Sequence, residues 1–169
     1  NEHEKYGIPF HTVNGRLQRL AEACQVIKLL FSEDSANFNG DFYQLNDAPL
    51  VPKPVKPMPL LIGGGGEKVT LKITAQYADE WNVWGTGDTL THKMKILDQH
   101  CERLNRDPAS IQRSAVALLF LSDDEQFLNK IREGGTGRPM IVGNVSEVQE
   151  IVAAYQAAGV DEIIIPDFN

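Results

Sequence analysis

Apolar side chains recur at helical spacing in several stretches of the chain. Residues 17–31 place them on one face of a helix, and Asn14 and Gly15 precede this stretch as start signals. Similar patterns predict helices over residues 67–77, about 89–105 and 124–132, and a last helix that Ser146 caps. Together these stretches predict the helical layer of the fold.

Short apolar runs alternate with these helices. They predict strands over residues 60–62, 80–84, 114–121 and 161–166, and the nearly continuous run at 114–121 is typical of a strand buried on both faces. Asn39-Gly40 is a hairpin turn signal, which predicts a small insertion hairpin over about residues 36–48. The proline-rich connector after the hairpin can be neither a helix nor a central strand.

The order of these elements defines the fold class. Strands alternating with helices indicate βαβ units, a parallel sheet and right-handed connections, so the chain is α/β. About four such strands correspond to half of an eight-stranded barrel. We expect one domain over residues 1–169, because this length supports one compact core and is too short for two.

Composition narrows the classes of partner. The net charge is −7 and no basic stripe occurs, which argues against nucleic acid. No apolar run approaches the roughly 18 residues of a membrane helix, and no secretion signal is evident. Cys24 and Cys101 fall in helical stretches without a CxxC pattern, which favours reduced thiols in the cytoplasm. The histidines lack the spacing of a metal site.

A run of four glycines, Gly63 to Gly66, separates the first predicted strand of the alternating series from its helix. Glycines let the backbone approach a ligand closely, and the N–H groups at a helix start attract anions; a flexible tight turn is the alternative interpretation. The run is not a Walker motif, because Glu67-Lys68-Val69 follows it. No acidic residue ends a second strand about 20 residues later, as a dinucleotide fingerprint requires.

Two other places hold candidate side chains. In the strand over residues 80–84 we expect Trp81 and Trp84 to share one face, with Asn82 opposite, either as packing or as the wall of a substrate pocket. His3 is either an ordinary surface histidine or a polar ligand contact. No catalytic residue can be assigned from the order of residues alone.

Residues 2–10 read E-H-E-K-Y-G-I-P-F and resemble the E-H-x-x-Y-G-I-P-F segment of luciferase-like flavin or deazaflavin oxidoreductases. One departure from the family pattern is Glu80, where glycine usually precedes Trp-Asn. Further matching segments follow in family order: R-L-Q-R-L-A-E-A (16–23), N-G-D-F-Y (39–43), P-K-P-V-K-P (52–57), P-L-L-I-G-G-G-G-E-K (59–68), A-D-E-W-N (78–82) and G-V-D-E (159–162).

The resemblance implies the C-terminal half of a (β/α)₈ TIM barrel. It also implies that the deazaflavin F420, or alternatively FMN, binds at the C-terminal ends of the strands. The combination of motifs is most similar to members that are F420-dependent. The residues that the resemblance assigns to the cofactor are Asn1, Glu2, His3, Gly63, Gly64, Gly65 and Gly66.

The resemblance further implies an oxidoreductase acting on a small organic substrate. Hydride would pass between that substrate and C5 of F420, or reduced FMN would support monooxygenation with oxygen. The chain opens on Asn1 with no leading element, so we expect a fragment that lacks four strands and is incomplete for catalysis. Open sheet edges then favour self-association, most simply a homodimer. The alternatives are a non-catalytic half-barrel and an unrelated phosphate-ligand-binding α/β domain.

Overall fold

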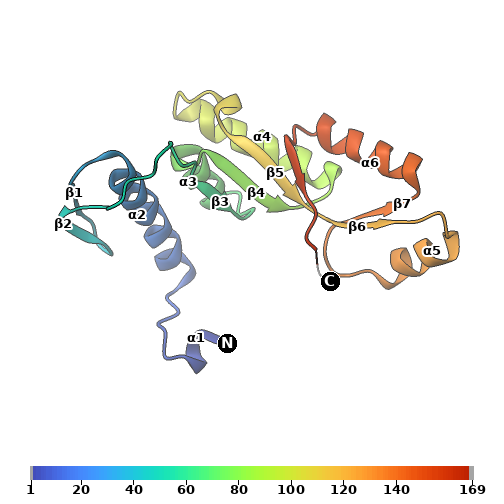
Figure 1. Ribbon diagram of the computed structural model, residues 1–169, viewed down its shortest axis with the longest axis horizontal. Helices are drawn as coiled ribbons and strands as arrows, with labels where there is room; N and C mark the ends of the chain where they lie inside the picture. The colour runs from blue at the N-terminus through green and yellow to red at the C-terminus, as the bar shows by residue number, and fades with distance from the viewer. Residues whose placement is uncertain (1, 168–169) are drawn as a thin grey trace. The chain divides into compact units, whose positions relative to one another are not determined.

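A computed structural model describes residues 2–167 of the chain (Figure 1). It divides into two compact units, Asn1–Leu60 and Leu61–Asn169. The single domain expected over residues 1–169 stays a prediction. Asn1, one of the expected cofactor contacts, lies outside the described residues.

The first unit consists of a long helix and a hairpin. Helix α1 (Glu2–Lys5) is one turn, and α2 (Val13–Ser32) begins earlier than predicted because the Thr12 side chain accepts a hydrogen bond from the Gly15 N–H. Asn14 and Gly15 therefore lie inside the first turn. Strands β1 (Ala36–Asn39) and β2 (Gln44–Ala48) pair antiparallel, which confirms the predicted hairpin.

A single carboxylate holds the hairpin turn within this unit. Glu22 of α2 accepts hydrogen bonds from the backbone N–H groups of Asp41, Phe42 and Tyr43 at 2.9, 2.9 and 3.1 Å. Burial by itself raises the pKa of Glu22, but these three donors and the charge of Arg19 outweigh it, and the pKa is lowered. The turn is therefore bound to an ionised side chain at neutral pH.

The second unit alternates strands and helices as predicted. Its elements are β3 (Leu61–Gly63), α3 (Thr70–Tyr77), β4 (Glu80–Trp84), α4 (Gly87–Arg103), the 3₁₀ turn η1 (Pro108–Ser110), β5 (Gln112–Val116), β6 (Leu118–Leu121), α5 (Glu125–Gly134), β7 (Met140–Gly143), α6 (Val145–Ala157) and β8 (Glu162–Ile164). Four of the strands form one sheet in the order β3-β4-β5-β8, and every pair is parallel. The four-stranded parallel sheet is thus confirmed.

The run at residues 114–121 was expected to be one strand, and this prediction is wrong in its second half. The run divides at Ala117: β5 stays in the sheet, while β6 leaves it and pairs with β7, a strand that the sequence did not predict. Residues 113–116 are buried, whereas β6 alternates between half-buried and exposed positions. Burial on both faces requires a layer packed against each face, and the alternating burial of β6 shows that one of its faces is uncovered.

The predicted cap of the last helix is also wrong. Asn144, not Ser146, caps α6, because its side chain accepts from the Glu147 N–H at 3.1 Å while the Glu147 carboxylate accepts from the Asn144 N–H at 2.8 Å. This reciprocal pair forms a capping box immediately after β7. Because the connection is short, α6 packs against β7.

The core lies between the sheet and helices α3, α4 and α6, which cover one of its faces (Figure 1). Helices α4 and α6 also pack against each other. Among residues 2–167, no helix is both long and apolar enough to cross a membrane. The large side chains that are fully buried in this core are Leu71, Trp81, Leu90, Leu97, Ile111, Ile141 and Tyr155.

Candidate functional site

The carboxyl end of β3 carries the glycine run, residues 63–66, which we call the glycine loop. In parallel α/β folds, ligands bind outside the carboxyl ends of the strands, so the loop lies where a ligand is expected. It leads through a turn into α3, as the alternation of strand and helix predicted. The Gly64 N–H donates to the Asn82 carbonyl at 3.0 Å, which extends the β3–β4 pairing into the loop.

Three of the four carbonyl oxygens of the loop, those of Gly64, Gly65 and Gly66, accept hydrogen bonds from other elements of this unit. A peptide unit is planar and trans, so its N–H points opposite to its C=O. Each of these hydrogen bonds therefore also fixes the direction of the N–H group in the same peptide unit, which belongs to Gly65, Gly66 or Glu67. The three hydrogen bonds are Trp81 Nε1 to Gly64 O at 2.8 Å, Lys93 Nζ to Gly65 O at 2.8 Å and Leu71 N to Gly66 O at 2.9 Å.

Two of the glycines are required by geometry. Gly64 has a φ of +121°, a region that side chains with a Cβ rarely adopt. A Cβ on Gly66 would lie 2.7 Å from the Thr70 hydroxyl oxygen. The loop therefore needs these glycines to keep its shape, which a merely flexible turn would not require.

Glu67, the residue after the loop, belongs to an ion-pair network. Glu67 Oε1 lies 3.2 Å from Lys93 Nζ and 3.5 Å from His92 Nε2. The hydrogen bond from Lys93 is the main reason that the pKa of Glu67 is lowered; burial opposes it, and the charges of Lys93 and His92 lower the pKa further. The Glu67 carboxylate is therefore ionised at neutral pH and compensated by basic groups of α4.

The two tryptophans of β4 lie on opposite faces, so the expectation that their indoles share one face is wrong. Strand residues alternate between faces, and positions three apart cannot lie on the same side. Trp81 is fully buried against the helices, whereas Trp84 is 38% exposed, with the guanidinium of Arg138 4.9 Å from its ring centroid. The predicted contact of both indoles with substrate stays a prediction.

On the face away from the helices, strand register brings together a row of polar or small residues. Asn82 Nδ2 donates to Ser114 Oγ at 2.8 Å, one direct link within this row. Sequence reasoning found Gly63 and Asn82 but missed Ser114, Glu162 and the Arg138 that stacks on Trp84. The alternation of residues along a strand indicates the face on which each side chain lies. Only the pairing register shows which residues of neighbouring strands lie side by side. We call the row of Gly63, Asn82, Ser114 and Glu162 the polar row.

Two predicted contacts lie in the first unit. Glu2 and His3 belong to α1, and the His3 ring packs 4.7 Å from that of Phe10. His3 also lines a pocket of about 510 Å³ together with Arg16 and Arg19 of α2. The glycine loop belongs to the other unit, so a cofactor site shared by Glu2, His3 and the loop stays a prediction.

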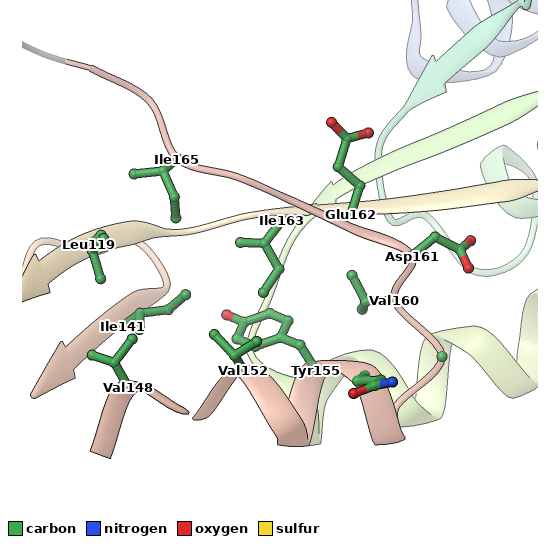
Figure 2. A pocket seen from close by; sticks show the side chains of 12 residues that line it. Leu119, Ile141, Val148, Val152, Tyr155, Val160, Asp161, Glu162, Ile163 and Ile165 are labelled. Atoms are coloured by element: carbon green, nitrogen blue, oxygen red, sulfur yellow. The ribbon is translucent and has the colours of Figure 1, made fainter. Parts of the chain in front are cut away.

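A larger groove of about 680 Å³ opens between α6, β8 and the β6–β7 pair. Figure 2 shows Val152 and Tyr155 of α6 facing Ile163 of β8, with Leu119 and Ile141 on the strand side. Its charged lining residues among those described are Asp161 and Glu162, and no Lys, Arg or His lines it. An anionic cofactor is therefore not expected there, and the glycine loop remains the better candidate.

Other reactive side chains add little to this site. Cys24 and Cys101 are buried and free, and burial raises the pKa of both thiols. Within residues 2–167, no group of three His, Cys, Asp or Glu side chains is placed to hold a metal ion. The predicted cytoplasmic location stays a prediction.

Residues 1–133 match the model of the luciferase-like monooxygenase family, and the chain belongs to this family. It is 39% identical over 130 residues to an F420-dependent glucose-6-phosphate dehydrogenase of Kineococcus radiotolerans, covering 75% of this chain and 38% of that protein. It is 30% identical to an FMNH(2)-dependent dimethylsulfone monooxygenase of Pseudomonas putida, covering 96% of this chain and 56% of the relative.

A solved F420-dependent secondary alcohol dehydrogenase in complex with an F420–acetone adduct shares the fold. Its TM-score is 0.79 at 18% identity, and the match covers 94% of this chain and 59% of the other. The predicted fold class, α/β of the TIM-barrel family, is thus confirmed. The chain spans only 38% and 56% of the two relatives' lengths, and these relatives divide between F420 and FMNH(2).

Proposed function

We propose that this chain carries the cofactor-phosphate loop of an F420-dependent oxidoreductase that acts on a small organic substrate. FMN is the alternative cofactor. The proposal is supported most by the glycine loop, in which hydrogen bonds to three carbonyls fix three successive N–H groups, the kind of group that binds an anion. Bound F420 would supply a hydride donor or acceptor, while the chain's own residues bind and orient it.

The loop fits a phosphate group of either cofactor. Phosphate oxygens accept several hydrogen bonds and carry negative charge, which a nest of N–H groups at a helix start favours. F420 is preferred over FMN because the 39%-identical relative is F420-dependent. Asn82 and Trp84 would contact the substrate from the open face of β4, while Trp81 would act only through its hold on Gly64.

A fluorescence titration tests this proposal. The chain is titrated with F420, with FMN and with riboflavin, which lacks the phosphate of FMN. We expect F420 to bind most tightly and FMN to bind more tightly than riboflavin. Equal affinity for FMN and riboflavin would show that the phosphate makes no contact and would contradict the assignment.

The same titration with Gly64→Val locates the site. The variant places a Cβ where φ is +121°, so the loop must change shape and F420 affinity is expected to fall at least about tenfold. Gly134→Val is the matched control, because a Cβ at Gly134 meets no atom within 4 Å. Unchanged F420 affinity in Gly64→Val, with the fold intact by circular dichroism, would contradict the assignment of the loop as the phosphate site.

We propose further that the chain by itself self-associates and turns over no substrate. Its parallel sheet ends at β3 on one side and at β8 on the other, and an open strand edge offers unpaired N–H and C=O groups. Leu61, Trp84 and Ile164 on the open face are 46%, 38% and 37% exposed. A second copy would pair both edges and give eight parallel strands around these side chains.

Sedimentation measures this association. We expect a dimer for the unmodified chain and a shift to monomer for Ile164→Lys, which places a charge on the open face of the edge strand. Val145→Lys, at an exposed site at the start of α6, is the control and should remain dimeric. A monomer of the unmodified chain would contradict the proposal.

A further inference from the structure

Three side chains of α4 contact either the glycine loop or Glu67, the residue that follows it. Lys93 and His100 are seven residues apart, two helical turns, and His92 adjoins Lys93. Besides the contacts of Lys93 and His92 already described, His100 Nε2 lies 2.9 Å from the Glu67 carbonyl oxygen. Helix α4 therefore supports the loop, although strand β4 lies between the loop and α4 in the sequence.

We propose that Lys93 is a positioning residue that prepares the glycine loop to bind an anion, by fixing the Gly65 peptide and by compensating the Glu67 carboxylate. The inference rests on the proposed function only for the identity of the anion, a cofactor phosphate. The sequence of the glycine loop does not itself indicate the role of Lys93. Lys93 lies 28 residues from Gly65 along the chain.

The first part of this role is geometric. Glycine on both sides of a peptide lets that peptide rotate readily, so a glycine run does not hold its N–H groups in one direction unaided. Lys93 Nζ donates to Gly65 O at 2.8 Å and thereby fixes the plane that carries the Gly66 N–H. Hydrogen bonds from a charged donor are stronger than those between neutral groups. The side chain is 26% exposed, so the contact is partly shielded from water.

The second part is electrostatic. Glu67 directly follows the loop, and an ionised carboxylate close to an anion site repels the ligand. Lys93 lies 3.2 Å from this carboxylate, and its charge offsets the repulsion. His92 is a weaker partner, because it lies 3.5 Å away and its side chain is 69% exposed.

The test uses the whole chain and inorganic phosphate as the probe. Phosphate binding is followed by the amide NMR signals of Gly65 and Gly66, and F420 affinity is measured in parallel. Lys93→Met is expected to weaken both about tenfold, the size of effect that losing a charged hydrogen bond produces. Lys93→Arg should recover most of the affinity. The control is Lys95→Met, which removes the same charge from an exposed position of α4 and should change neither.

Two further measurements separate the parts of the role. Glu67→Gln combined with Lys93→Met should recover part of the lost affinity if compensation of the carboxylate matters, and no recovery would overturn that part. Without any ligand, hydrogen exchange of the Gly66 amide should be faster in Lys93→Met and unchanged in Lys95→Met. Equal effects of the two lysine variants would overturn the inference.

Failure of the proposed function gives a different pattern. If the unmodified chain binds neither phosphate nor F420, the cofactor assignment falls. The exchange rate of the Gly66 amide still decides whether Lys93 holds the loop, because that measurement needs no ligand. Identical exchange in the unmodified chain and in Lys93→Met would overturn the positioning role independently of any cofactor.

Discussion

The two faces of the β3-β4-β5-β8 sheet differ in polarity and, along β3, β4 and β8, in exposure. The face toward α3, α4 and α6 buries Ile62, Trp81 and Ala115, none more than 4% exposed. The opposite face carries the polar row and the partly exposed indole of Trp84. Parallel sheets are usually covered on both faces, so the open face stands out as the one that a ligand or a second sheet can occupy.

Strand β4 shows what this difference teaches. Trp81 and Trp84 are the same residue type in one five-residue strand, yet one belongs to the core and the other to the open face. The helix-covered face nevertheless reaches the candidate site, because Trp81 Nε1 donates to Gly64 O at 2.8 Å. Packing on the helix-covered face thus shapes the glycine loop, which is proposed to bind a ligand at the open face.

The largest expected effect follows from truncating Trp81. Trp81→Ala should lower the free energy of unfolding by about 3–5 kcal/mol, since it leaves a large cavity in the core. Urea denaturation followed by circular dichroism measures this loss. The same truncation at Trp84 is the matched control and should cost less than about 2 kcal/mol, because that side chain is partly solvated already. Equal losses would contradict the division between the faces.

Tyr155 tests the helix-covered face with a smaller change. Its hydroxyl donates to the Gly85 carbonyl oxygen at 2.7 Å, and the side chain is 1% exposed. Tyr155→Phe removes only the oxygen and should lower the free energy of unfolding by about 1–2 kcal/mol through the unpaired carbonyl. Urea denaturation at neutral pH measures the difference.

The pH dependence of the same residue gives a second check. Burial raises the pKa of Tyr155 above its ordinary value of 10.0. A raised pKa in the folded state means that this contribution to stability is complete below pH 10 and is lost as the pH rises further, because the unfolded chain releases its proton first. Tyr155→Phe should therefore lose less stability above pH 10 than the unmodified chain. An identical alkaline loss would assign the effect to other groups.

The fold was largely predictable from the sequence, for a physical reason. Helices and strands leave a local period of apolar residues, and the hairpin has a local turn signal in Asn39-Gly40. Strand β7 was missed although a local signal exists, because Met140, Ile141 and Val142 form a short apolar run before Gly143, as Leu60 to Ile62 do before Gly63. The cap of α6 was misplaced by two residues because Asn144 and Ser146 are both suitable caps, and Glu147 decides between them.

The candidate site was only partly predictable. The glycine loop is continuous in sequence, and its residue type is itself the signal. Lys93, Ser114 and Glu162 come from elements far along the chain, and only helix packing and strand register bring them to the loop or the polar row. The error about the tryptophans had a different origin, since the alternation of strand residues already excludes a shared face for positions three apart.

The smallest change sharpens the comparison most directly, because the chain has only two tryptophans. Trp84→Phe should alter the free energy of unfolding by less than about 0.5 kcal/mol, as substitutions near the surface usually do. It leaves Trp81 as the only indole, whose fluorescence should resist acrylamide quenching. Trp81→Phe leaves Trp84 alone, and its fluorescence should be quenched readily. Similar quenching of the two indoles would contradict the separate faces, whereas protection of Trp84 upon addition of F420 would place the cofactor or its substrate on the open one.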